Sequence, residues 1–558
     1  MRNKNFALIT TLFLVLAVAV TACGPAATQA PVATEAPAAT QAPAATEAPV
    51  ATQAPVATEA PAATQAPAAT EASVATQAPA GETRGVLKYN AGLDYGGNEN
   101  LDPTDPDRFY PLIALLFDHL TEPTGTTFSP SPSLAESWES NDKGDVWTFH
   151  LRDDAYFHDG KQLTSADVAY SVDHWKNGEE SVLASTFGGV QKVETPDDFT
   201  VVFTLDNPNF DFPMLTMDYR ARILPKDGLP DILTTGNGTG PFKLEKLDVL
   251  GVTKVVANDD YWGGPPGLAG IEIYTIADVQ ANLQALQSGQ IDFGQVTLAE
   301  SELFKGDDNY VVTQIPSGNW SGFVMRTDIE PFNNKALRQA FLKVADRQDM
   351  MDLVLGGAGT LSCDTAVMPG DPYQLTDCPD GAQDIEAAMA KLAEAGYADG
   401  FEIDLYTSDL VAEWNQMAEI FQQAAAKAGI KVNIVTAPAA GFYSDTWMVK
   451  PFVMTNWNER SAPQALNEIY RGGGSWNESY WNVPEFDALL DKAAAEPSVD
   501  ARRQDYLDAQ QMLHEEGGTI IPFFVNIIRV QKSCVQNIPE MGVFYMVWTG
   551  ITKSPDCK

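Results

Sequence analysis

A proline stands at nearly every sixth position between Pro25 and about Ala80, in a repeat of Ala-Pro-(Val/Ala)-Ala-Thr-(Gln/Glu). The repeat contains no aromatic residue, no Lys and no Arg, so it cannot bury enough apolar surface to offset the entropy lost on ordering. Regular proline favours extended, polyproline-like conformations. We therefore expect residues 23–84 to be a disordered, semi-rigid tether that reaches at most roughly 170–180 Å.

The segment before the repeat has the composition of an export signal. A basic start, Met1–Asn5, precedes the apolar run Phe6–Val20, which is too short for an ordinary membrane span. Small residues then lead to Cys23 in Val20–Gly24, a pattern that resembles the bacterial lipobox. The resemblance implies that residues 1–22 are removed and that Cys23 becomes the lipidated first residue; an ordinary signal peptide with an incidental Cys is the alternative.

The 475 residues from Arg84 to Lys558 have an ordinary globular composition, and their length predicts two or three lobes. The whole chain has 75 acidic and 35 basic residues, a net charge of −40, and no run rich in Lys or Arg. Nucleic acid is therefore excluded as an expected partner, because its binding needs a basic footprint. The acidity favours solubility and disfavours lying flat on an anionic membrane.

Four cysteines besides Cys23 remain, and an even number in an exported chain suggests disulfides. Local pairing, Cys363 with Cys378 and Cys534 with Cys557, is the simplest of the three connectivities. Four free buried thiols are the alternative. No pair has a spacing typical of zinc sites.

Strand and helix patterns alternate along the body. Expected strands are Val86–Asn90, Trp147–Leu151, Ile271–Tyr274, Ile291–Phe293, Phe401–Tyr406 and Ile430–Val435, and expected helices are about 164–175, 278–289, 384–396 and 411–428. Strand–helix–strand units of this kind imply parallel pairing and α/β layers.

Five motifs follow one another along residues 85–540. They are Leu134–Glu139 with Trp147–Arg152 and Phe157–Val168, then Gly238–Leu244, Asn258–Gly264, Leu337–Phe341 with Ala345–Arg347, and Ala393–Tyr397. Together they resemble the signature blocks of family 5 extracytoplasmic solute-binding proteins, the peptide-type (dipeptide- and oligopeptide-binding) receptors of ABC importers.

The resemblance implies an α/β fold of the type II periplasmic-binding-protein kind, a two-lobed clamp with an extra subdomain. Lobe I would be discontinuous, subdomain II would follow its first part, and lobe III would be a single stretch. The implied bounds are 85–115, 236–322 and 516–558 for lobe I, 116–235 for subdomain II and 323–515 for lobe III. The crossings near 322 and 516 would form the hinge, and its closure on a ligand between lobes I and III would present a closed surface to a membrane permease.

Three patterns could indicate catalysis or a metal, and each has a simpler interpretation. In the family, the block around His158-Asp159 is a structural turn. The loop Gly236–Gly240 lacks a following Lys-Ser/Thr and leads into an expected strand, so phosphate binding is not expected. His514 has no second His at zinc-helix spacing, and the five His are scattered. We expect a protein that is not an enzyme and uses no metal or cofactor.

The ligand contacts are expected in two segments of lobe III, because clefts of this kind combine aromatic walls with a few polar groups. The predicted residues are Trp457, Asn458, Glu459, Arg460, Trp476 and Asn477 in lobe III, with Tyr95 and Asn98 in lobe I and Trp320 near the hinge.

The family resemblance places a ligand-reading segment at Trp457–Arg460. Dipeptide binders offer an Asp there to the peptide amine, and an Arg for the carboxylate in the stretch that matches Tyr406–Asp409, which has no basic group here. Glu459 could still bind an amine and Arg460 a carboxylate in bidentate fashion. The alternatives are a lobe-surface ion pair for Glu459 and Arg460, and core packing for the tryptophans.

These observations predict a monomeric, lipid-anchored solute receptor of an ABC importer, on the outer face of the cytoplasmic membrane. By family resemblance alone, its ligand is a small peptide or a peptide-like molecule. A sugar is the alternative, because Trp, Asn and Glu suit sugar faces and hydroxyls. A surface hydrolase, which would need two carboxylates roughly 5–9.5 Å apart, and a sensor of ligand state are the rivals from other classes.

Overall fold

The computed structural model describes residues 84–92, 96–125, 128–378, 381–542 and 545–557. The predicted signal peptide, the lipidation site at Cys23, the tether up to residue 83 and Tyr95 lie outside these residues. Within the described ranges, no helix combines the length and the apolar character needed to cross a membrane.

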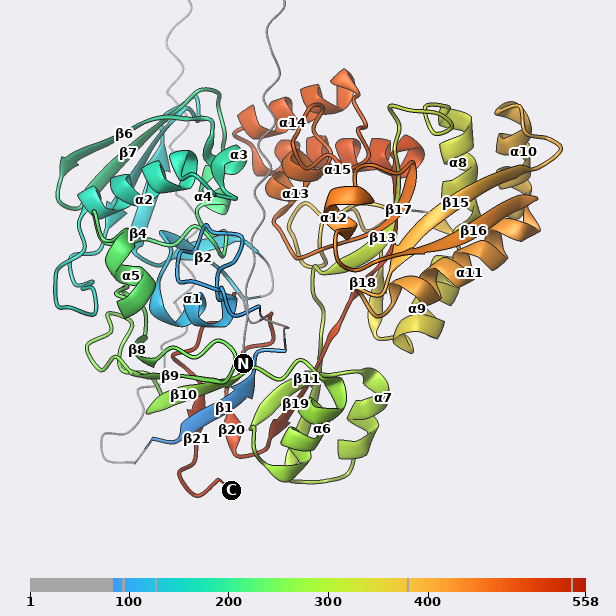
Figure 1. Cartoon of the computed structure of the whole chain (residues 1–558). Coiled ribbons are helices and arrows are strands. Elements are labelled where there is room, and N and C mark those ends of the chain that lie inside the picture. The colour runs from blue at the N-terminus through green and yellow to red at the C-terminus, as the bar shows by residue number, and fades with distance from the viewer. Residues whose placement is uncertain (1–83, 93–95, 126–127, 379–380, 543–544, 558) are drawn as a thin grey trace, which may run out of the picture. The chain divides into compact units, whose positions relative to one another are not determined.

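Lobe I is built around a seven-stranded mixed sheet with the strand order β12-β19-β11-β1-β10-β9-β8. Its strands are β1 (Val86–Asn90), β8 (Phe242–Lys246), β9 (Val252–Ala257), β10 (Gly270–Tyr274), β11 (Phe293–Val296), β12 (Tyr310–Ile315) and β19 (Ile527–Lys532). Blue β1 lies beside green β10 in Figure 1 and pairs with it in parallel, as it does with β11. These three strands therefore end at the same edge of the sheet.

The connection between β10 and β11 follows the sequence prediction. Helix α6 (Val279–Ser288) begins after Asp278, whose side chain accepts a hydrogen bond from the Ala281 N–H, and ends at Gly289 in the left-handed conformation. The short elements α7 (Leu298–Ser301) and η1 (Glu302–Phe304) follow β11.

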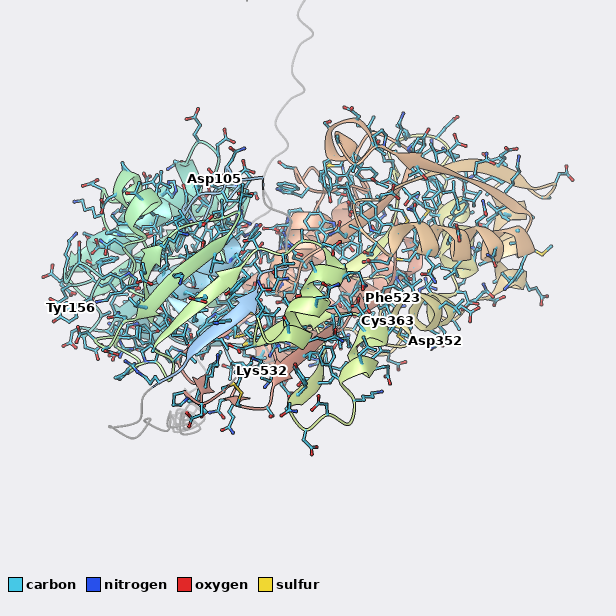
Figure 2. The ribbon with its side chains drawn as sticks, turned by 60° about the horizontal axis from the view of Figure 1, so that its bottom comes forward. Asp105, Tyr156, Asp352, Cys363, Phe523 and Lys532 are labelled. Atoms are coloured by element: carbon cyan, nitrogen blue, oxygen red, sulfur yellow. A yellow bond between two sulfur atoms is a disulfide. The ribbon has the colours of Figure 1, made fainter. Side chains whose placement is uncertain are left out.

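Buried Asp292 ties the end of the chain to lobe I. Lys532 Nζ lies 3.2 Å from Asp292 Oδ1, and Lys553 Nζ lies 2.6 Å from Asp292 Oδ2. Lys532 is labelled in Figure 2. Lys553 belongs to β21 (Thr552–Lys553), which pairs with β20 (Val535–Gln536).

Subdomain II contains a four-stranded antiparallel sheet with the order β4-β5-β7-β6. Its strands are β4 (Ala135–Ser140), β5 (Val146–Leu151), β6 (Val190–Asp197) and β7 (Thr200–Leu205), and its smaller elements are β2 (Thr121–Pro123), β3 (Pro130–Pro132), α3 (Ala184–Phe187), α4 (Phe212–Leu215) and α5 (Leu229–Thr235). Helix α1 (Tyr110–Leu116) precedes them and packs against β8 of lobe I. The alternation in β5 buries Trp147, Phe149 and Leu151 as expected. Helix α2 (Ser165–Asn177) begins where the sequence predicts it, after Thr164, which forms a capping box with Asp167.

Lobe III is built around a six-stranded sheet with the order β14-β18-β13-β17-β15-β16. Its strands are β13 (Trp320–Met325), β14 (Gly359–Leu361), β15 (Phe401–Ser408), β16 (Ile430–Ala437), β17 (Phe452–Trp457) and β18 (Thr519–Val525). Its helices are α8 (Lys335–Val344), α9 (Arg347–Leu355), α10 (Ile385–Glu394), α11 (Trp414–Lys427), α12 (Phe442–Asp445), α13 (Ala462–Ile469), α14 (Pro484–Ala495) and α15 (Val499–Glu516). β15 and β16 are parallel, and α11, which joins them, packs on both, so the predicted strand–helix–strand unit is confirmed.

The sheets place the two lobe crossings at other residues than 322 and 516. The chain enters lobe III between β12 and β13, at residues 316–319, and leaves it between β18 and β19, at Asn526. β18 pairs with β13 inside the sheet of lobe III, with Phe524 opposite Trp320. Its side chains are almost entirely buried there, which is why residues 516–525 belong to lobe III and not to lobe I.

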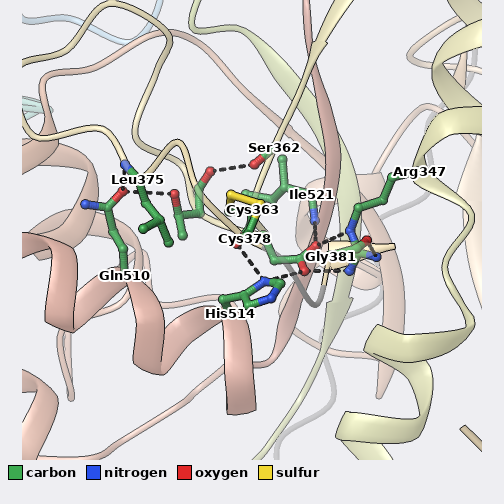
Figure 3. The surroundings of a disulfide bond; sticks show 11 residues. Arg347, Ser362, Cys363, Leu375, Cys378, Gly381, Gln510, His514 and Ile521 are labelled. Atoms are coloured by element: carbon green, nitrogen blue, oxygen red, sulfur yellow. Dashed lines mark hydrogen bonds and ion pairs between the residues drawn. A yellow bond between two sulfur atoms is a disulfide. The ribbon is translucent and has the colours of Figure 1, made fainter. Parts of the chain in front are cut away.

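Two disulfides join the predicted partners. The sulfur atoms of Cys363 and Cys378 are 2.06 Å apart, and Cys534 is bonded to Cys557. The first disulfide lies in a polar, buried setting (Figure 3), where the Cys363 carbonyl is 3.2 Å from His514 Nδ1. Beside it, Arg347 pairs with Asp364 at 2.5 Å. The loop between the cysteines is therefore held between α9 and α15.

Removing the first disulfide should destabilise lobe III. We expect Cys363→Ser together with Cys378→Ser to lower its free energy of unfolding by about 3 kcal/mol, because chain entropy gives about this value for a loop of this length, here a separation of 15 residues. Urea unfolding of the full chain, followed by near-ultraviolet circular dichroism, measures the change. The unmodified protein under reducing conditions is the control, and free thiols or a bridge between the two pairs in non-reducing peptide mapping would contradict the pairing.

Candidate ligand-binding site

A cavity of about 320 Å³ lies between lobe I and lobe III, next to the hinge. Lobe I and the hinge contribute Asn90, Ala91, Gly92, Pro111, Ile276, Ala277, Val279, Asn282, Gln295, Val296, Thr297, Glu300, Asn319, Ile527 and Gly542, and lobe III contributes Asn458 and Glu459. A volume of this size is at the lower end of the range for small-molecule sites. It suits a compact solute enclosed by both lobes.

The topology of the two sheets explains the position of the cavity. Asn90, Ile276 and Thr297 lie at or just beyond the carboxyl ends of the parallel strands β1, β10 and β11. Asn458 directly follows β17, which is parallel to β15. Ligands of open α/β sheets bind outside the carboxyl ends of parallel strands, because the loops diverge there. Both sheets therefore bring such an edge to one cavity.

Side-chain amides fix the wall that lobe I provides. Asn90 Oδ1 accepts from the Ile276 N–H at 2.9 Å, while Asn90 Nδ2 donates to the Ile276 carbonyl at 2.9 Å and to Asn282 Oδ1 at 3.0 Å. Asn282 Nδ2 in turn donates to the Gln295 carbonyl at 2.8 Å. The wall is thus rigid and carries no charge of its own at these positions.

Glu459 is the buried acid of the cavity, with 4% of its surface exposed. Burial raises the pKa of its carboxyl to about 7, although the Gly318 N–H, 3.3 Å from Oε2, works in the opposite direction. Oε1 lies beside Gly542, where an added Cβ would come within 2.5 Å of it. Among the described residues that line the cavity, two are glutamates, Glu300 and Glu459, and none is Lys or Arg. The cavity is therefore acidic and suited to a cation.

The structure places Arg460 outside this cavity. Its Nε lies 2.7 Å from Glu468 Oε2, and its Nη1 donates to the Asn458 carbonyl at 2.9 Å. Its guanidinium also stands over the Trp457 ring, 4.8 Å from the centroid. Arg460 therefore forms an ion pair within the protein, as the alternative interpretation expected. Its partner, however, is Glu468 and not Glu459.

The predicted tryptophans Trp320 and Trp457 lie in the core. They stand opposite each other in β13 and β17, with 2% and 8% of their surfaces exposed. Trp457 Nε1 donates to Glu478 Oε1 at 2.9 Å, and Thr455 Oγ1 donates to Glu478 Oε2 at 2.7 Å. Neither ring lines the cavity, so both support the segment that carries Asn458 and Glu459.

The remaining predicted residues lie elsewhere. Trp476 is 39% exposed and meets Trp457 edge to face, with the ring centroids 6.1 Å apart. Asn477 is buried, and its Nδ2 donates hydrogen bonds to the carbonyls of nearby loop residues at 2.7–3.2 Å. These bonds hold the loop in place. Asn98 is exposed and does not line the cavity. Sequence reasoning missed Asn90, which its position as the last residue of the first strand could have indicated.

His158 occupies a turn, as the structural interpretation expects. Its Nε2 lies 3.0 Å from the Gly240 carbonyl and its Nδ1 lies 3.3 Å from the Gly236 carbonyl. Burial lowers its pKa to about 4, so the ring is neutral near pH 7. It joins the turn of subdomain II to the glycine-rich loop.

Comparisons with known proteins identify the family. Residues 129–478 match the family model for bacterial extracellular solute-binding proteins, family 5 (middle). Heme-binding protein A of Haemophilus influenzae is 28% identical over 425 residues, covering 69% of this chain and 77% of that protein. The dipeptide-binding protein of Escherichia coli is 26% identical over 445 residues, covering 73% and 83%. The chain belongs to family 5 of the bacterial extracellular solute-binding proteins, which serve ABC transporters.

Solved structures show the same fold. The periplasmic binding protein DppA of Helicobacter pylori, in complex with the peptide STSA, superposes with a TM-score of 0.71 at 22% identity, covering 84% of this chain and 98% of that protein. The predicted α/β clamp is therefore confirmed at the level of the fold.

Glu459→Gln should make folding less sensitive to pH. The pKa of Glu459 is about 7 in the folded protein, against an ordinary value of 4.5. Between these values the folded state binds more protons than the unfolded state, so the free energy of unfolding falls as the pH rises. From pH 4.5 to 8, we expect the wild type to lose about 1–3 kcal/mol more than Glu459→Gln, measured by urea unfolding at each pH.

Other buried acids do not disturb this comparison. Burial also raises the pKa of Glu122, Asp371 and Glu478 to about 7, but these groups are present in both proteins and cancel in the difference. Glu485→Gln, at an exposed position of α14, is the matched control and should behave as the wild type does. Equal losses in Glu459→Gln and the wild type would show that burial does not raise the pKa of Glu459.

Proposed function

We propose that this protein captures a small peptide or peptide-like solute with a free amine and delivers it to the permease of an ABC importer. The observation that carries the proposal is the acidic cavity, with buried Glu459 and no Lys or Arg among its described lining residues. The E. coli relative is a dipeptide-binding protein and H. pylori DppA is bound to the peptide STSA, and both support the class of solute.

A protonated amine would supply what the Glu459 carboxylate lacks. Among the described residues, the donor that is hydrogen-bonded to this carboxylate is the backbone N–H of Gly318. An ammonium group donates three hydrogen bonds and carries the opposite charge, so it offsets the cost of ionising a buried acid. Binding would then lower the pKa of Glu459 and release the proton that the empty site holds below pH 7.

The hinge would sense the ligand through the same residue. Gly318 and Asn319 lie in the crossing between the lobes, and Asn319 Oδ1 accepts from the Glu459 N–H at 3.1 Å. A solute held between the lobe I wall and Glu459 contacts both sides of this hinge. It therefore binds the closed arrangement better than an open one, which is the condition for ligand-driven closure.

The carboxyl end of the solute would be read loosely. Arg460, the residue predicted for a carboxylate, is paired with Glu468 outside the cavity. Without a cation in the described lining, the site selects the amine end and tolerates a free, amidated or extended carboxyl end. No catalytic step belongs to this function.

Dipeptides that differ only at their ends test this reading. We expect N-acetylation to weaken binding by about 10–100-fold, because it removes a hydrogen bond and charge pair with a buried carboxylate, whereas C-terminal amidation should change it little. Isothermal titration calorimetry measures both.

Two further measurements sharpen that test. Glu459→Gln should bind the free and the acetylated dipeptide about equally, while Glu485→Gln should keep the wild-type preference. Affinity for the free dipeptide should rise from pH 5.5 to 7.5, because the carboxylate is the binding form and the amine stays largely protonated in this range. Equal binding of both dipeptides to the wild type would refute amine recognition at Glu459.

We further propose that the mature protein is a monomer attached by a lipid at Cys23, with residues 1–22 removed and residues 23–84 serving as the tether. The support is the lipobox-like Val20–Gly24 and the proline repeat behind it. Cys23→Ala should move the protein from the detergent phase to the aqueous phase in Triton X-114 partitioning. A wild-type protein that starts at another residue and carries no lipid would sink this proposal.

A further inference from the structure

A second cavity, of about 570 Å³, lies between subdomain II and lobe III and shares no lining residue with the first. We propose that this second cavity is a binding site of its own, for an uncharged amphipathic molecule that contains an aromatic or alicyclic ring. Its volume lies within the range of small-molecule sites. Its floor is apolar, with Val190, Leu205 and Phe212 from subdomain II and Pro463 and Ala494 from lobe III.

The charged side chains in its wall are already paired, which argues for an uncharged ligand. Glu468 Oε2 lies 2.7 Å from Arg460 Nε, and its Oε1 accepts from Thr186 Oγ1 at 2.7 Å. Arg471 Nη2 lies 2.7 Å from Asp491 Oδ1. A charge on the ligand would lose hydration without gaining a partner of opposite charge.

Trp476 provides a fixed aromatic surface at this cavity. Two other rings support it from lobe III, with centroid distances of 6.1 Å to Trp457 and 6.0 Å to Trp447. Asn477, the next residue, fastens the loop by its contacts with the carbonyls of Tyr470 and Trp481. The ring is held in place, yet 39% of Trp476 stays exposed. A rigid and accessible aromatic face of this kind stacks on a planar or puckered ring.

Polar groups at the rim complete the amphipathic character. Ser185 and Asn207 from subdomain II and Ser475 from lobe III line the cavity and are exposed. Their hydroxyl and amide groups can bind hydroxyl or amide substituents on a ring whose body contacts the apolar floor.

Hydrogen bonds hold the two walls together, so the cavity is a built feature of the fold. The Phe210 N–H donates to the Ala494 carbonyl at 2.7 Å, and Tyr506 OH donates to Asp211 Oδ2 at 3.0 Å. The hydrogen bond from Thr186 Oγ1 to Glu468 Oε1 is a third. Each of these bonds joins subdomain II to lobe III across the cavity.

N-phenyl-1-naphthylamine, an uncharged aromatic amine that fluoresces in apolar sites, is a suitable probe for the full-length protein. We expect saturable binding at one site. Ala494→Trp should fill the cavity and weaken binding by at least about tenfold. Ala495→Trp changes the next residue of α14, which is exposed and does not line the cavity, and should leave binding unchanged.

Further variants keep the test decisive if Ala494→Trp fails to fold, which thermal unfolding would reveal. Trp476→Ala should also weaken probe binding, whereas Glu459→Gln in the first cavity should not. The proposal is overturned if the wild type shows no saturable binding, if Trp476→Ala or a folded Ala494→Trp binds as the wild type does, or if a dipeptide displaces the probe competitively. Dipeptide binding is measured separately by isothermal titration calorimetry. Its absence would contradict only the proposal for the first cavity.

Discussion

Two chain crossings between the seven-stranded and the six-stranded sheet are bonded to each other, and the rest of the molecule is arranged around them. Ser317 Oγ donates to the Val525 carbonyl at 2.7 Å, and the Val525 N–H donates to the Asn319 carbonyl at 2.8 Å. Any rotation of one lobe against the other must pass through these few residues. Because Gly318 and Asn319 also form hydrogen bonds with Glu459, this buried acid of the first cavity and the hinge form one hydrogen-bonded unit.

The acidity of the first cavity follows from where the chain places its arginines. Arg220 pairs with Asp218 at 2.6 Å and lies 3.5 Å from Glu468, which also binds Arg460. Burial alone would raise the pKa of Asp218, but Arg220 holds it below its usual range. These cations neutralise carboxylates between subdomain II and lobe III. None of these cations lines the first cavity, whose buried acid is Glu459.

Local signals predicted the elements of the fold well, because caps and periodicity are short-range. The helix between Asp278 and Gly289 and the helix that begins after Thr164 lie where the sequence predicted them. The lobe bounds expected from the sequence differ from those of the two sheets. The reason is that β18 pairs with β13, about 200 residues away in the chain, and short-range patterns do not predict such a pairing.

In the candidate site, too, the identity of a segment could be predicted from the sequence, but long-range contacts could not. The resemblance of Trp457–Arg460 to a family segment predicted Asn458 and Glu459, which line the first cavity. The contacts of Arg460 and Asn477 depend on partners that only the folded chain brings together. The second cavity could not be predicted at all, since its walls come from segments more than 200 residues apart.

The position of the last strands sets an order for folding. β19 lies between β11 and β12 in one sheet, and β18 lies between β13 and β14 in the other. Neither large sheet can be completed until residues 519–532 have been made, whereas the sheet of subdomain II needs only residues 135–205. As a chain emerges from its N-terminus, subdomain II can fold as the first unit. A nascent or truncated chain would therefore hold a finished subdomain but no finished clamp, and the capacity to bind solute would arise only when nearly the whole polypeptide has been made.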